Sequence, residues 1–240
     1  MKNQKNNLLF LGLTGLCGIA AAVLRVLMLS KGLDEKGLLV SGNLYNIGLW
    51  VLSIGYLAAL IALLRTTGGN GSFQDNFSGC RIRGGISIAA GALLTVHSLG
   101  HIMAGQMLVG VFGAVAGVCM AAAGLCRWQD KHPIPLPHIL VCVFFIIRLV
   151  LSFQGWSADP QLQDYALQML ACVCLMLFSF HRASCDAGII NRRRTAFFGL
   201  AAVYFCLASL SDQTMPLFYF AAGAWTVGAG CTLEKLPEEA

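Results

Sequence analysis

The residues best suited to chemistry are two arginines and two histidines that stand inside apolar stretches of the chain. Arg148 begins the run RLVLSFQGW, Arg25 begins the run RVLMLSKG, and His97 and His101 lie four residues apart. An ionisable side chain within a membrane-crossing helix costs about 3 kcal/mol unless it has a partner or faces a polar cavity, so such residues mark functional sites. The planar guanidinium of arginine binds two oxygens of a carboxylate or phosphate. The two arginines therefore predict a site for an anionic ligand.

The two histidines allow three interpretations, because their spacing places both imidazoles on one face of a helix. They could bind zinc with a carboxylate as the third ligand. They could be axial ligands of haem, which needs a second histidine at equal depth on another helix. His138 and His181 do not offer one, because both lie near the other side of the membrane from His97 and His101. They could also form hydrogen bonds between helices and line a polar pocket. We favour the last interpretation and expect no resident cofactor.

Composition determines the class of protein that must hold these residues. Of the 240 residues, 57% are hydrophobic and only 11% are charged, whereas soluble domains carry about 25% charged residues. The apolar residues also form long unbroken runs, which are typical of transmembrane helices. We predict an all-α integral membrane bundle that occupies residues 1–240 as a single transmembrane domain. A soluble enzyme is excluded, and no nucleic-acid partner is expected.

Eight membrane spans are predicted from the apolar runs. They cover residues 8–29, 42–64, 84–105, 107–126, 136–155, 163–182, 196–211 and 215–232. Spans 84–105 and 107–126 are rich in glycine and alanine, and small residues let helix backbones approach closely. We expect these two spans to pack against each other or in the centre of the bundle, with a very tight turn at Gly105 and Gln106.

The distribution of Lys and Arg predicts the orientation of the chain. One side of the membrane would carry twelve of these residues, and the other only Lys31 and Lys36. Cytoplasmic loops are the ones enriched in Lys and Arg. We therefore predict a multi-pass protein of the bacterial cytoplasmic (inner) membrane with both termini in the cytoplasm. The ten cysteines are expected to form no disulfides, because none lies in a predicted outer loop and the cytoplasm is reducing.

With this orientation, the polar residues of the spans collect at one level in the outer half of the membrane. A carboxylate of Asp159 or Asp164 is expected to approach Arg148 from above. Arg25 is shallower and can also extend its guanidinium to the interface. The predicted ligand-binding residues are Arg148, Arg25, His97, His101, Tyr45, Asn46, Asp159, Asp164, Tyr165 and Gln168.

An internal repeat is a further prediction. Arg25 and Arg148 are 123 positions apart, and each lies in the outer part of the first span of its half. Arg25 lies in the first predicted span and Arg148 in the fifth, which run in the same direction, so the halves 1–127 and 128–240 would form parallel four-helix repeats.

Segment 156–182 contains a group of residues that resembles a known family; they are Trp156, Asp159, Pro160, Gln163, Asp164 and Tyr165. It resembles a segment of a bacterial family of multispanning membrane proteins to which no activity is assigned, so the resemblance implies location and not chemistry. The function we expect is transporter-like: binding or transport of a small anion from an outward-facing polar pocket. The alternatives are a membrane redox anchor for haem or quinone, an intramembrane metal-dependent hydrolase using His97 and His101, and a non-catalytic membrane partner within a complex.

Overall fold

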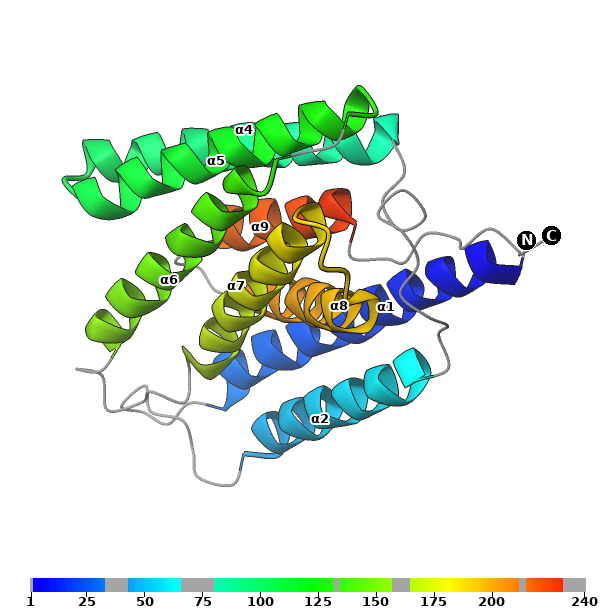
Figure 1. Cartoon of the computed structure of the whole chain (residues 1–240). Helices are drawn as coiled ribbons and strands as arrows, with labels where there is room; N and C mark the ends of the chain where they lie inside the picture. Colours follow the sequence, from blue (N-terminus) through cyan, green and yellow to red (C-terminus); the bar gives the residue numbers. More distant parts are fainter. Residues whose placement is uncertain are drawn as a thin grey trace.

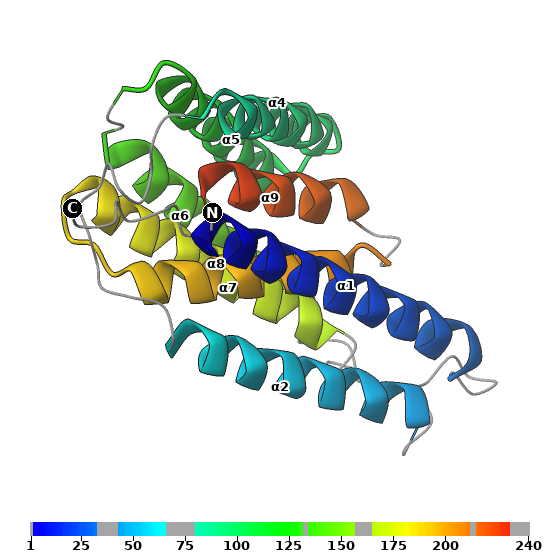
Figure 2. The ribbon, with the colours of Figure 1, turned by 90° about the vertical axis from the view of Figure 1, so that its right-hand side faces the viewer.

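The computed structural model describes residues 2–32, 43–65, 80–131, 134–156, 165–211 and 215–230, and within them it is entirely helical. The eight helices are α1 (Lys2–Lys31), α2 (Leu44–Arg65), α4 (Arg81–Met103), α5 (Met107–Trp128), α6 (Leu136–Trp156), α7 (Ala166–Asp186), α8 (Arg192–Ser209) and α9 (Pro216–Ala229). They form one bundle (Figure 1), with α4 and α5 side by side at one edge and α2 at the opposite edge (Figure 2). The predicted all-α architecture is confirmed.

Six of these helices are long and apolar enough to cross a membrane: α1, α2, α4, α5, α6 and α7. Their outward faces expose large hydrophobic side chains, such as Leu16 (72% exposed), Val51 (65%) and Val96 (67%). Exposed apolar surface on this scale is stable in lipid and not in water. The chain is therefore a polytopic membrane protein whose exposed apolar faces are suited to contact with hydrocarbon.

Helices α8 and α9 differ from the other six. They have 18 and 14 residues, or about 27 Å and 21 Å at 1.5 Å per residue, below the roughly 30 Å of a hydrocarbon core. Both lie in the interior: Ala201, Tyr204 and Trp225 are completely buried. The predicted spans 196–211 and 215–232 thus correspond to short core helices around which the longer helices pack.

The α4–α5 hairpin is the closest helix pair and confirms the prediction that these two spans pack together. A Cβ atom on Gly84 would lie 2.9 Å from the carbonyl oxygen of Gly124, and one on Gly124 would lie 2.9 Å from that of Gly84. The turn between the helices needs Gly105, whose φ of 82° is one that residues with a Cβ rarely adopt. Helix α9 packs against the same hairpin, where a Cβ on Gly228 would meet the amide nitrogen of Ser87 at 2.8 Å.

Two tyrosines, Tyr56 and Tyr204, connect α1 and α2 to the core helix α8 through ring stacking and through hydrogen bonds of their hydroxyls. The rings of Tyr56 and Tyr204 stack with centroids 4.4 Å apart. The Tyr56 hydroxyl donates to the carbonyl oxygen of Leu200 at 3.2 Å and is 2.9 Å from the hydroxyl of Thr14. The Tyr204 hydroxyl lies 2.8 Å from that of Ser53. Each of these four buried hydroxyls, of Thr14, Ser53, Tyr56 and Tyr204, therefore has a partner in the apolar interior.

The helices alternate in direction, so the bundle has two distinct ends. At the hairpin end α4 turns into α5. Helix α6 ends there, and α2 and α9 begin there. At the terminus end α1 begins and α9 ends (Figure 1). Helix α7 packs along α8 in the second half of the chain, whereas α2 packs on α1 and α8. The two halves make different contacts, and the duplication of 1–127 and 128–240 stays a prediction.

Candidate functional site

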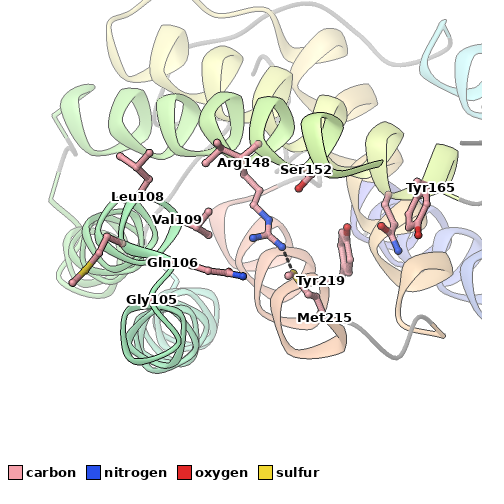
Figure 3. A pocket seen from close by; sticks show the side chains of 13 residues that line it. Gly105, Gln106, Leu108, Val109, Arg148, Ser152, Tyr165, Met215 and Tyr219 are labelled. Carbon is pink, nitrogen blue, oxygen red and sulfur yellow. Dashed lines mark hydrogen bonds between the residues drawn. The ribbon is translucent and has the colours of Figure 1, made fainter. Parts of the chain in front are cut away.

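A pocket of about 690 Å³ lies at the hairpin end, between α5, α6, α7 and α9 (Figure 3). Its walls come from segments that are far apart in the sequence. The lining residues are Gly105, Gln106, Met107, Leu108, Val109, Arg148, Leu151, Ser152, Gly155, Tyr165, Gln168, Met215 and Tyr219. Polar groups and apolar side chains both contribute, as is usual for sites that bind small organic molecules.

Arg148 extends from α6 across this pocket toward the start of α9 (Figure 3). Its residue is only 6% exposed. The guanidinium lies 5.0 Å from the centroid of the Phe218 ring, and Nη2 contacts the sulfur of Met215. Within the described residues, the carboxylate of Asp186 forms ion pairs with His138 and Arg182, and no carboxylate pairs with Arg148. An aromatic face and a thioether compensate a buried charge far less than an anion does.

Gln168 and Gln106 add hydrogen-bonding groups to the same pocket. Gln168, on α7, is 2% exposed, and its amide nitrogen Nε2 has no hydrogen-bond partner among the described residues. Gln106, in the α4–α5 turn, points its side chain into the pocket toward Arg148 (Figure 3). The first turn of α9 forms another part of the wall, and its N-cap residue Met215 makes no side-chain capping bond. The positive end of a helix dipole therefore faces the pocket with the guanidinium.

The two histidines form a hydrogen-bonded chain that ends at the pocket wall. His97 Nε2 and His101 Nε2 are 3.2 Å apart, and His101 Nδ1 is 2.6 Å from Oε1 of Gln106. Because an amide oxygen only accepts, His101 Nδ1 is the donor to Gln106. A neutral His101 then accepts at Nε2 from His97. These hydrogen bonds lie within α4 and the turn that follows it. We had expected the histidines to form hydrogen bonds between helices, and these two bonds do not.

Binding of zinc or haem by these histidines stays an untested alternative to the expectation of no resident cofactor. In the parts of the chain that the structure describes, no three His, Cys, Asp or Glu side chains come together as metal ligands. Two imidazole nitrogens alone leave a tetrahedral zinc site half complete. The third ligand would have to come from residues such as Asp159 or Asp164, which lie outside the described ranges.

The structure brings together three of the predicted site residues: Arg148, Tyr165 and Gln168 line one pocket. Arg25 is 3% exposed, so its side chain is covered by protein, and it is not part of the pocket lining. Tyr45 and Asn46 lie half-buried at the start of α2 and do not line the pocket either. A ligand-binding role for these last three residues stays a prediction.

A second charged cluster, which the sequence interpretation missed, lies at the terminus end. His138 Nδ1 is 2.7 Å from Oδ2 of Asp186, and Arg182 Nη1 is 3.2 Å from Oδ1 of the same carboxylate. Arg127 donates to the carbonyl oxygen of Gly228 at 3.1 Å. All four charged side chains belong to residues that are at most 7% exposed. The i, i+4 spacing of Arg182 and Asp186 was the available signal, but the predicted span 163–182 ends at Arg182 and leaves Asp186 in the loop that follows, whereas α7 continues to Asp186.

Aromatic side chains fill the space between the two charged regions. The Trp225 ring lies 6.0 Å from that of His138 and 6.3 Å from that of Phe145. The Phe145 ring lies 6.3 Å from Phe218, over which Arg148 stands. Phe145, Phe218 and Trp225 are at most 1% exposed. These three residues, which we call the aromatic core, separate the Arg148 pocket from the His138 cluster.

Comparison of the chain with protein-family models, with curated proteins and with solved structures found no match. The family suggested by segment 156–182 stays a prediction. Function must therefore be inferred from the chemistry of the site itself.

Proposed function

We propose that this membrane protein binds a small anionic ligand in the Arg148 pocket, as a binding or transport protein. The observation that supports the proposal most directly is a buried guanidinium at the wall of a large pocket, with no carboxylate partner among the described residues. A buried charge without an anion nearby keeps much of its desolvation cost. An incoming carboxylate or phosphate would remove that cost and would form two parallel hydrogen bonds with the guanidinium.

The neighbouring groups fit the same ligand chemistry. Gln168 Nε2 is a buried donor without a partner in the described chain. His101 holds Oε1 of Gln106, so the amide nitrogen of Gln106 remains to donate into the pocket (Figure 3). Together with Arg148 they form a set of donors, which suits an acceptor-rich anion. His97 acts through His101 by fixing the orientation of the Gln106 amide.

We further propose that the pocket faces the outside of a bacterial inner membrane. Among the residues that the structure describes, few Lys and Arg residues lie at the hairpin end and most lie toward the terminus end. This asymmetry favours a cytoplasmic terminus end.

The experiment that tests binding is a thermal-shift screen of the purified protein with soluble carboxylates and phosphates. A ligand present at 100 times its Kd stabilises the folded state by about 2.7 kcal/mol. We expect Arg148→Gln to lose the ligand-dependent rise in Tm. Arg65→Gln, which removes an exposed arginine at the end of α2, should retain it. Equal responses of the two variants would contradict the proposal.

A further inference from the structure

We infer that the ligand of the Arg148 pocket is an anionic amphiphile, with its carboxylate or phosphate head at Arg148 and its hydrocarbon chain along α5. This inference rests on the proposed anion-binding function and adds the nature of the rest of the ligand. It depends on how the polar and apolar parts of the pocket are arranged.

The polar groups are concentrated at the inner wall of the pocket. Arg148 and Gln168 belong to residues that are 6% and 2% exposed, and the guanidinium of Arg148 contacts Met215 and Phe218 at the start of α9. The Gln168 amide nitrogen has no partner among the described residues, and neutral donors beside a guanidinium suit a head group with two or more oxygens. The head group is therefore expected to lie deep in the pocket.

The opposite wall is apolar and continuous with the outer surface of the protein. Met107 and Leu108, in the first turn of α5, line the pocket and are 60% and 61% exposed. Leu151 of α6 adds another apolar side chain to the lining. Because these side chains belong to helices that carry lipid-exposed apolar faces, the pocket opens toward hydrocarbon as well as toward the hairpin end.

Helix α5 continues this apolar wall beyond the pocket. Val111, Val115 and Val118 follow Met107 at four, eight and eleven positions, and they are 49%, 44% and 60% exposed. This spacing places all four side chains on one face of the helix. This row of apolar side chains runs from the pocket along α5. An alkyl chain whose head group is bound at Arg148 could therefore lie along it.

The size of the pocket also favours a ligand larger than a simple anion. Cavities of about 300–1,000 Å³ hold drug-sized molecules, and this one has about 690 Å³. An inorganic phosphate or an acetate at Arg148 would leave the wall formed by Met107, Leu108 and Leu151 without contacts. An alkyl chain would cover that wall.

The test compares matched probes by thermal shift on the purified full-length protein. Sodium phosphate and sodium acetate supply the head alone, monooctyl phosphate and octanoate supply the head with a chain, and 1-octanol supplies the chain alone. Affinity should rise roughly fourfold for each methylene that leaves water. We expect the two octyl anions to half-saturate at concentrations at least about tenfold below those of phosphate and acetate, and octanol to give no comparable shift.

Two substitutions separate the head from the chain. Arg148→Gln should abolish the response to the octyl anions. Leu108→Gln should weaken that response about tenfold, whereas Val96→Gln, at an equally exposed position on α4 that does not line the pocket, should leave it unchanged. Both glutamines replace exposed side chains, so neither should prevent folding.

The outcomes distinguish failure of this inference from failure of the proposed function. If phosphate or acetate binds as tightly as its octyl derivative, the amphiphile is refuted and anion binding stands. If octanol shifts Tm as much as the octyl anions do, and Arg148→Gln has no effect, both are refuted. If Leu108→Gln and Val96→Gln behave alike, the chain does not lie along α5 and the inference is wrong.

Discussion

Two arginines at comparable positions in their spans have different surroundings. Arg148 lines a pocket, while Arg25 is buried on α1 and is not among the residues that line that pocket. Sequence showed that both interrupt apolar runs, and this was enough to identify Arg148, Gln168 and Tyr165 as candidates. It could not show which of the polar residues share a cavity, because helical periodicity gives the face of a residue and not its neighbour on another helix.

The carboxylate of Asp186 lies between the imidazole of His138 and the guanidinium of Arg182, and its removal should destabilise the protein. Its side chain has no exposed surface and pairs with His138 and Arg182. Removing one partner of a buried ion pair costs about 3–5 kcal/mol, because the remaining charge loses its counter-ion. We expect Asp186→Asn to lower Tm clearly in thermal unfolding of the purified protein.

The matched control is Asp130→Asn. Asp130 is exposed in the turn after α5, and its φ of 54° is one that asparagine also adopts readily. This variant should unfold close to the wild-type temperature. If Asp186→Asn is as stable as Asp130→Asn, the cluster at the terminus end does not contribute to folding.

Among the helices, the α4–α5 hairpin is the element that sequence described best. Small residues on both spans and a tight connection predicted close packing, and the structure agrees. The lengths of α8 and α9 could be read approximately from the sequence. Their central position could not, because an apolar residue that faces lipid and one that faces protein look alike in a membrane sequence.

A pair of glycine substitutions in α4 tests the hairpin. A Cβ on Gly91 would lie 2.5 Å from the carbonyl oxygen of Gly117 and 2.7 Å from the amide nitrogen of Ala121, so Gly91→Ala must push the two backbones apart. Such overpacking costs about 1–3 kcal/mol. Gly100 has no heavy atom near its Cβ position, and Gly100→Ala should be neutral or slightly stabilising. Thermal unfolding of both variants measures the difference, and equal effects would contradict the close packing.

At the scale of the whole molecule, the aromatic core divides the protein into two charged regions. The Arg148 pocket lies on one side of it and the His138 cluster on the other, and its three residues come from α6 and α9. In this arrangement the proposed ligand would enter the pocket from the hairpin end or from the hydrocarbon, and the aromatic core would block its passage to the terminus end. Transport would require the aromatic core to rearrange, whereas binding alone would not.

Access from one end can be measured with a membrane-impermeant maleimide on intact bacterial cells. Ser152 lines the pocket, and Ser152→Cys should be labelled from outside if the hairpin end faces outward. The native Cys80 and Cys126 lie half-buried near the terminus end and should react only after the cells are permeabilised. The protein without the new cysteine gives the background. Labelling of Ser152→Cys only after permeabilisation would reverse the proposed orientation, and no labelling under either condition would show that water does not reach the pocket.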